Sequence, residues 1–252
     1  MKRKIQMSAV GACLLALTTI SKAEIIRFAS EGAYPPFDMI DSNGQLYGFE
    51  IELVKAMCDE MKADCPFIAQ DWEGLMPGLL ANKYDAVIAG ISVTPEREAV
   101  IDFAAPYQTT YNAFAVRKDS PINDMSPQSF AGKIIATQAS AAQAIYAEDV
   151  YVAAGAQVRL YATAQEANRD LANHRVDAVT NNNLPLLEWL NTDGRDCCRY
   201  LGKLDSTATT MAIAVRKKSN SLKDRLNKAL ESIKRNGTYD KLIKKYFKYT
   251  DE

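Results

Sequence analysis

Apolar side chains recur along this chain with the spacings of helices and of buried strands. From Phe49 they recur every four positions as far as Met61, which predicts one face of an amphipathic helix. Near the C-terminus the same spacing runs from Leu222 to Ile233. After Gly237 a further apolar series reaches Phe247, so we expect two consecutive helices there.

Short apolar runs between these helices predict strands over residues 25–29, 84–90 and 133–137. Helix starts are indicated by Asp71, by Thr94-Pro95, by Ser140 and by a capping box formed by Thr163 and Glu166. Because strand and helix signals alternate, the pattern favours parallel βα units and an α/β fold.

One segment of the chain is echoed 92 positions later. Leu79–Val87 parallels Leu171–Val179, since in each a helix ends at Asn and Asp-Ala-Val begins a strand. We interpret the echo as two similar α/β lobes, each built on its own mostly parallel sheet. Ligands of such sheets bind beyond the carboxyl ends of the strands, which predicts a cleft at residues 89–90 and 181–182.

The N-terminus has the layout of a secretory signal peptide. Residues 1–4 are basic, residues 5–20 are mostly apolar, and Ser21-Lys22-Ala23 supplies small residues for cleavage after Ala23. A membrane anchor and a lipid attached at Cys13 are the alternatives. No later segment approaches 18 uninterrupted apolar residues, so the mature protein, with 252 − 23 = 229 residues, is expected to be soluble.

Composition and charge exclude several classes of protein. With 48% hydrophobic residues, and 30 basic against 31 acidic residues, the chain is neither disordered nor a nucleic-acid-coating protein. The signal peptide carries four of the basic residues, so the mature chain has 26 against 31 and a net charge of −5. A single histidine, His174, excludes histidine-rich metal sites, and nucleotide and hydrolase motifs are missing. We therefore expect no cofactor, metal or nucleic-acid partner.

Export to an oxidising compartment changes how the cysteines are interpreted. Cys58 and Cys65 are placed to close a short loop as a disulfide, the alternative being two buried thiols. The adjacent Cys197 and Cys198 fit either a vicinal disulfide or two free thiols. A zinc site made of all four lacks the usual paired spacing.

A further group of residues has the chemistry to hold a small zwitterion. Arg97 can bind a carboxylate with two hydrogen bonds, and Ser92 and the N–H groups after Ser140 can add donors. Glu31 offers a negative partner for a ligand cation, and Tyr34 and Trp72 offer flat aromatic faces. The alternative is that Arg97 is a surface residue paired with its acidic neighbours, Glu96 and Glu98.

Four segments of the chain resemble the polar amino-acid solute-binding proteins (family 3) of ABC importers. They are residues 31–37, 48–53, 85–97 and 237–242, and the resemblance covers the whole mature chain, the Cys58/Cys65 pair included. It implies the type II periplasmic-binding-protein fold, with two α/β lobes joined by two hinge strands. Residues 24–110 and 208–252 would form lobe 1, and residues 111–207 lobe 2, with hinges near 108–112 and 206–210. Such a protein is a periplasmic receptor, expected here as a monomer, that delivers its ligand to an inner-membrane permease.

The resemblance also implies roles for single residues. Arg97, Ser92 and the amide of Ala141, next to Ser140, would hold the α-carboxylate. Gly90 would accept from the α-ammonium. The ligand side chain would lie between the rings of Tyr34 and Trp72. Glu31 would be the acid that faces its distal cation.

The main departure from the family is Asn182, where the family usually has an aspartate for the α-ammonium. An amide offers no charge pairing, so free α-amino acids are expected to bind less tightly than with aspartate, unless the ligand carries a modified amine. A basic amino acid such as arginine, lysine or ornithine is the preferred ligand, with cystine second and opines or similar conjugates as an alternative.

Two further classes of function compete with a transport receptor. Some relatives are dehydratases, but an enzyme needs an acid or base in the lobe 2 wall, where residues 181–183 are all asparagine. We therefore expect a protein without catalytic activity. A sensor or adhesin that binds without transport is the third possibility.

Overall fold

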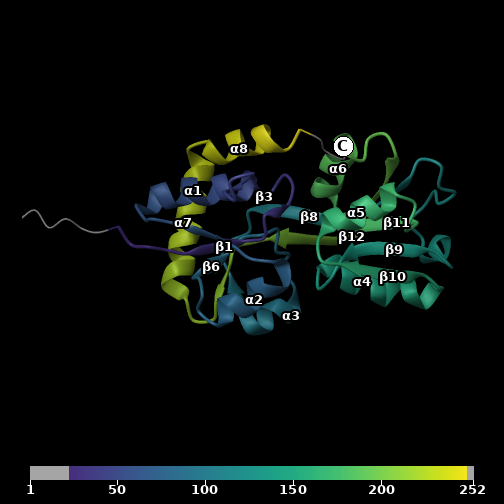
Figure 1. The fold of residues 1–252 in the computed structure, drawn as a ribbon. Coiled ribbons are helices and arrows are strands. Elements are labelled where there is room, and N and C mark those ends of the chain that lie inside the picture. Colours follow the sequence, from purple (N-terminus) through teal and green to yellow (C-terminus); the bar gives the residue numbers. More distant parts are fainter. Residues whose placement is uncertain (1–22, 249–252) are drawn as a thin grey trace, which may run out of the picture.

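The computed structural model describes residues 23–248, which fold around two five-stranded sheets (Figure 1). In spatial order the first sheet contains β5 (Phe67–Ala69), β1 (Phe28–Ser30), β6 (Ala86–Val87), β13 (Ala214–Arg216) and β7 (Ile101–Phe103). The second contains β10 (Gln157–Tyr161), β9 (Ile134–Gln138), β11 (Ala178–Asn182), β8 (Gln108–Arg117) and β12 (Cys198–Met211). In each sheet the first three strands are parallel and the last two join antiparallel. A small third sheet holds β2 (Ala33–Tyr34), β3 (Asp38–Ile40) and β4 (Leu46–Tyr47).

Helices cover both sheets, as the α/β prediction requires. Around the first sheet lie α1 (Phe49–Met61), α2 (Trp72–Leu80), α3 (Pro95–Val100), α7 (Asn220–Arg235) and α8 (Thr238–Tyr246). Around the second lie α4 (Ala142–Tyr151), α5 (Ala164–Ala172) and α6 (Asn183–Asn191), with 3-10 turns η1 (Pro127–Phe130) and η2 (Val152–Ala154). The apolar stripes of α1 and α7 pack into one core, which confirms the helices predicted from the four-residue spacing.

The local signals in the sequence succeed for two helix caps, and fail in part for a third cap and for one strand. Thr163 and Glu166 form the predicted capping box, and the Thr94 hydroxyl accepts from the N–H of Arg97. Asp71 occupies the N-cap position of α2, but its side chain makes no capping hydrogen bond. The strand predicted over 84–90 is wrong in length, because Gly90 has φ 59° and turns the chain away after β6.

The echoed segments have the same backbone geometry, which supports the interpretation as related α/β units. Asn82 and His174 occupy equivalent places after α2 and α5, with left-handed φ values of 61° and 60°. Asp85 then accepts from the N–H just before β1, and Asp177 accepts from the first N–H of β9. The same helix end and the same strand anchor therefore occur in both halves.

Two long strands run between the halves of the molecule in Figure 1. They are β8 and β12, which pair antiparallel from Cys198 opposite Arg117 to Met211 opposite Gln108. The register shifts between Leu204 and Thr209, an interval that overlaps the second predicted hinge, residues 206–210. The lobe boundaries and the hinge motion themselves stay predictions.

Both predicted cysteine pairs are joined. The Cys58–Cys65 disulfide is confirmed, and it ties the end of α1 to the strand that follows. For Cys197 and Cys198, where the sequence left two states open, the structure has a vicinal disulfide. The four cysteines among residues 23–248 are therefore all paired with each other.

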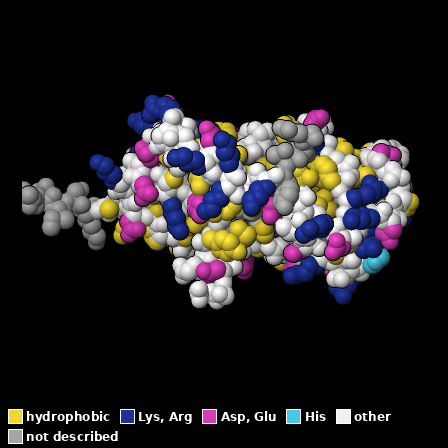
Figure 2. Space-filling model, turned by 90° about the horizontal axis from the view of Figure 1, so that it is seen from above, with side chains coloured by type: hydrophobic (Ala, Val, Ile, Leu, Met, Phe, Trp, Pro, Cys, Tyr) yellow, Lys and Arg dark blue, Asp and Glu magenta, His cyan; other side chains and the backbone are white. Residues whose placement is uncertain are grey.

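The surface seen in Figure 2 mixes basic, acidic and apolar side chains over both halves. Among the helices of residues 23–248, none has the length and apolar character to cross a membrane. The predicted signal peptide occupies residues 1–23, and all but its last residue lie outside the part of the chain described.

Candidate functional site

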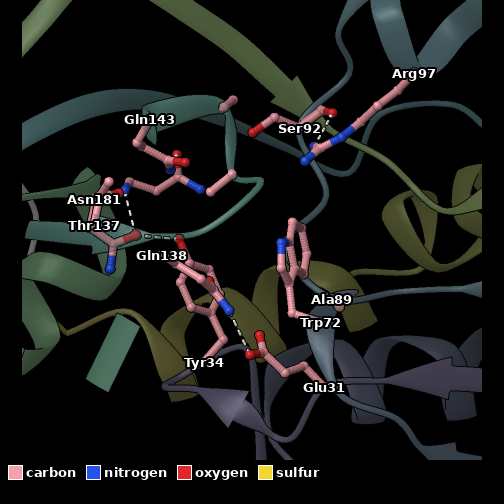
Figure 3. Close-up of a pocket in the computed structure, with 14 residues that line it drawn as sticks. Glu31, Tyr34, Trp72, Ala89, Ser92, Arg97, Thr137, Gln138, Gln143 and Asn181 are labelled. Atoms are coloured by element: carbon pink, nitrogen blue, oxygen red, sulfur yellow. Dashed lines mark hydrogen bonds between the residues drawn. The ribbon is translucent and has the colours of Figure 1, made fainter. Parts of the chain in front are cut away.

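A pocket lies where the strand ends of the two sheets face each other. Its residues come from both halves (Figure 3), and they are Glu31, Tyr34, Trp72, Ala89, Gly90, Ser92, Arg97, Thr137, Gln138, Ala141, Ala142, Gln143, Asn181 and Asn182. Eight of the nine residues predicted for the site are among them. The ninth, Ser140, lies beside the pocket, where its carbonyl oxygen accepts from Arg97.

Arg97 stands at one end of the pocket because the Thr94 cap fixes the first turn of α3. One guanidinium nitrogen donates to the carbonyl oxygen of Ser92 at 2.9 Å, and another donates to that of Ser140 at 3.2 Å. The guanidinium also lies 5.3 Å from the centre of the Trp72 ring. Burial lowers the pKa of Arg97 from its ordinary value. These bonds go to carbonyl groups and not to carboxylates, so the positive charge remains available to an anion in the pocket.

Further donors surround this end of the pocket. Ser92 is 3% exposed, and Ala141 is the N-cap residue of the ten-residue helix α4. The first N–H groups of a helix have no partner within the helix and favour an anion. Arg97, Ser92 and the start of α4 therefore form a site suited to a carboxylate.

The other end of the pocket holds a buried acid. Glu31 is 8% exposed, and its Oε1 accepts from Gln138 Nε2 at 2.7 Å. Burial, reinforced by the charge of Asp38 and opposed by the Gln138 bond, raises the pKa of Glu31 to about 8. Glu31 therefore holds its proton at neutral pH, and a cation placed beside it would favour the ionised form.

Two aromatic rings border the space above this acid (Figure 3). Tyr34 is 6% exposed, and its hydroxyl donates to Asn181 Oδ1 at 2.7 Å. Burial raises the pKa of Tyr34 further above its ordinary value, so the phenol is neutral. A Cβ at Gly90 would lie 2.7 Å from the Tyr34 ring, so only glycine lets the ring pack there. Trp72 begins α2 on the other side.

The wall contributed by the second half contains amides and no carboxylate. Asn182 is 2% exposed, and its Oδ1 accepts from Gln143 Nε2. Its N–H donates to Asn181 Oδ1 at 2.8 Å. Oδ1 of Asn182 already accepts one hydrogen bond, and the amide carries no negative charge. At this position the chain therefore offers a ligand ammonium a neutral amide and no carboxylate.

The residues missed by sequence reasoning all lie in this wall or next to it. Gln138, Gln143 and Asn181 make the hydrogen bonds across and along the pocket, and none was proposed as a ligand contact. Gln143 could have been found by comparing the two halves. It is the second residue of α4, and Glu50 is the second residue of α1 in the other half. That relation depends on knowing the helix starts.

A guanidinium and a helix start face a buried acid across a pocket between two α/β halves. This arrangement defines a two-lobed receptor for small zwitterionic ligands. Residues 26–249 match the family model of the bacterial extracellular solute-binding proteins, family 3, and the chain belongs to this family.

Individual relatives agree with the family match. The chain is 32% identical to the L-arginine-binding protein of Pseudomonas aeruginosa, over 99% of this chain and 98% of that protein. It is 39% identical to the octopine-binding periplasmic protein of Rhizobium meliloti, over 61% of this chain and 60% of that protein. Among solved structures, an ancestral arginine-binding protein bound to arginine has a TM-score of 0.83 at 33% identity, covering 88% and 98% of the two chains.

Proposed function

We propose that this protein is the extracytoplasmic receptor of an ABC amino-acid importer and binds an amino acid with a cationic side chain. The observation that carries the proposal is the opposition of Arg97 and Glu31 at the two ends of one pocket. A family match along the mature chain and relatives named for arginine support it.

In the proposed complex each end of the ligand meets its electrostatic complement. Arg97, the Ser92 hydroxyl and the Ala141 amide hold the α-carboxylate, and the carbonyl of Gly90 accepts from the α-ammonium. The side chain passes between the aromatic rings to the acid of lobe 1. Its cation lowers the pKa of Glu31, which then loses its proton.

Closure of the two lobes accompanies binding in this proposal. Lobe 1 comprises residues 24–110 and 208–252, lobe 2 comprises 111–207, and the hinges are 108–112 and 206–210. Glu31–Gln138 and Tyr34–Asn181 are hydrogen bonds between the lobes, and both flank the ligand space. A ligand that touches both walls therefore favours the closed arrangement over the open one.

The proposed partner is an inner-membrane permease, and the receptor acts as a periplasmic monomer after cleavage behind Ala23. We propose no catalytic activity. A dehydratase would need a proton-exchanging side chain in the lobe 2 wall. The polar side chains of that wall are amides and one threonine, namely Thr137, Gln138, Gln143, Asn181 and Asn182.

Titration calorimetry with L-arginine, L-lysine, L-ornithine, L-citrulline and L-cystine tests the proposed function. Citrulline has the shape of arginine without the cationic side chain, so it isolates the contribution of Glu31. We expect one binding site, a preference for arginine over citrulline of about tenfold, and recovery of the ligand unchanged. Absence of binding to every one of these compounds would refute the proposal.

A conjugate of an amino acid is the second candidate ligand, and the Asn182 amide favours it. An α-nitrogen that carries a carboxylate substituent would bring an acceptor to Asn182 Nδ2, where a free ammonium brings only donors. A second pocket of about 1,050 Å³ shares Tyr34 and Asn181 with the first and offers room. The octopine-binding relative is in line with this chemistry.

The Asn182→Asp substitution separates the two ligands. It places a carboxylate beside the α-nitrogen, so free arginine should bind about tenfold more tightly and an N-carboxyalkyl arginine about tenfold more weakly. If the wild-type protein prefers free arginine, the conjugate is eliminated and the receptor function stands.

A further inference from the structure

Two acidic side chains outside the ligand pocket are completely buried in lobe 1. Asp38 belongs to β3 and Glu50 is the second residue of α1, and both are 0% exposed. Their segments meet because Phe49 and Glu50 donate their N–H groups to the carbonyls of Pro36 and Phe37. Gly48 permits this approach, since a Cβ there would lie 2.5 Å from the Phe37 oxygen.

One oxygen of each carboxyl group holds a piece of backbone at the pocket. Asp38 Oδ1 accepts from the N–H of Gly32, which directly follows Glu31. Glu50 Oε1 accepts from the N–H of Gly90 at 2.8 Å and from the Tyr107 hydroxyl. The two acids therefore anchor backbone at two places in the pocket, directly after Glu31 and at Gly90.

The other two oxygens, Asp38 Oδ2 and Glu50 Oε2, are buried without a donor among the residues described. The carboxyl groups nevertheless lie in hydrogen-bonding contact with each other. Two ionised carboxylates cannot remain adjacent away from water, because neither charge is compensated. A proton between the oxygens satisfies both groups at once.

The surrounding charges indicate which group holds the proton. Burial, followed by the charge of Glu50, raises the pKa of Asp38 well above its ordinary value. Burial raises the pKa of Glu50 to about 7, against the effect of hydrogen bonds from Tyr107, Gly90 and Asp38. Glu31 is a third acid near enough to act on Glu50 once it is ionised. Glu50 accepts hydrogen bonds from Gly90 and Tyr107 and Asp38 accepts one from Gly32, so we assign Asp38 as the donor and Glu50 as the carboxylate.

We propose that Asp38 and Glu50 share one proton and act as a positioning pair that fixes the Gly32 and Gly90 backbone at the ligand pocket. The pair touches no ligand. Its effect on binding passes from Gly32 to Glu31 and Tyr34, and from the Gly90 N–H to the Gly90 carbonyl. The binding part of this proposal rests on the function proposed above, whereas the shared proton does not.

Amide substitutions test the shared proton because an amide can replace it once but not twice. In Asp38→Asn the new NH₂ group donates to Glu50, and in Glu50→Gln the new NH₂ group donates to Asp38. In the double variant two NH₂ groups would face each other, and neither can accept. Turning one amide so that its oxygen accepts breaks the hydrogen bond of that side chain with the N–H of Gly32 or Gly90. We expect L-arginine affinity to fall less than about threefold in each single variant and more than about tenfold in the double variant.

The pH dependence of unfolding without ligand gives a second measurement. The folded wild-type protein retains a proton that the unfolded chain has lost above about pH 4.3, so its stability falls as pH rises through 5 to 7. In Asp38→Asn the slope of the unfolding free energy against pH should become smaller by the contribution of about one bound proton. Glu52→Gln removes a partly buried acid of the same helix that is ion-paired with Lys245 and has a lowered pKa, so it should not reduce this slope.

Two results would overturn the shared proton. One is a loss of affinity in the double variant that equals the product of the losses in the single variants. The other is an unchanged slope of stability against pH in Asp38→Asn. If the double variant does not fold, the slope of the single variant still decides. Failure of the wild-type protein to bind L-arginine would count against the proposed function, while the slope would still test the pair.

Discussion

The two lobes use the same architecture for different chemistry. In lobe 1 the second residue of α1, Glu50, bonds the Gly90 amide beyond β6. In lobe 2 the second residue of α4, Gln143, bonds Asn182 at the end of β11. The two helix positions correspond, but the carboxylate of Glu50 accepts from a backbone N–H, whereas the amide of Gln143 donates to a side-chain oxygen.

The strands that begin each unit show the same contrast. Phe28 pairs with Ala86, and Ile135 pairs with Ala178, so the residues three positions further on, Glu31 and Gln138, correspond. These corresponding residues hydrogen-bond to each other across the pocket. In the proposed complex, lobe 1 therefore supplies the charges that select a ligand, and lobe 2 supplies neutral hydrogen bonds.

The largest effect should come from removing the lobe 1 cation. Arg97→Ala is expected to lower L-arginine affinity about 100-fold, because hydrogen bonds to a charged group contribute about 1.5–3 kcal/mol. Calorimetry measures the loss. Gln143→Ala in lobe 2 should lose less than about tenfold. Equal losses would show that the two walls contribute alike.

Arg175→Ala is the control for this comparison. Arg175 is exposed in lobe 2 and forms an ion pair with Asp170 at 3.0 Å, away from the pocket. Affinity should stay unchanged in this variant.

The disulfides offer the next comparison. Replacing Cys58 and Cys65 together by serine should destabilise the protein by about 2 kcal/mol, since the short loop gains entropy in the unfolded chain. Replacing Cys197 and Cys198 should cost less, because adjacent residues close almost no loop. Denaturant unfolding of both double variants measures the difference. A larger loss from the adjacent pair would contradict the entropic argument.

Glu31→Gln should change selectivity more than affinity. We expect L-arginine to bind about tenfold more weakly and L-citrulline to bind almost as before. The acid also couples binding to pH. Because the pKa of Glu31 is raised to about 8 and a bound cation favours its ionised form, binding releases a proton below that pH.

Affinity for L-arginine should accordingly rise between pH 6 and 8, by at most about tenfold per pH unit, and then level off. Calorimetry in buffers of different ionisation enthalpy counts the released proton. The Glu31→Gln variant is the control, since its affinity should not change over this range. A flat wild-type profile would mean that Glu31 is already ionised before the ligand arrives.

The smallest effects concern the helix caps. Thr163→Ala removes the capping box of α5 in lobe 2 and should cost about 1 kcal/mol of stability without affecting the ligand. Thr94→Ala removes the cap that fixes Arg97, so it should weaken binding as well, by about threefold. Thermal unfolding and calorimetry on both variants compare them. Equal binding losses would remove the link between the α3 cap and Arg97.

Local sequence signals predicted a large part of this molecule because they act over a few residues. The apolar spacing of α1, the capping box at Thr163 and the echo of the Asp85 and Asp177 strand anchors each depend on nearby side chains. The strand over 84–90 failed, since the left-handed turn at Gly90 serves the packing of a distant ring.

The sequence by itself determined the α/β class, the starts of α3 and α5, and the candidates for the Cys58–Cys65 disulfide and for the two ends of a zwitterion. Only the tertiary structure decided that Gln143 donates a hydrogen bond to the side-chain oxygen of Asn182 and that Gln138 donates one to Glu31. It also decided that two acids meet beneath the pocket. The physical reason is that a side chain's protonation and free hydrogen-bonding groups depend on neighbours brought together by folding, which for Glu31 and Gln138 are 107 positions apart along the chain.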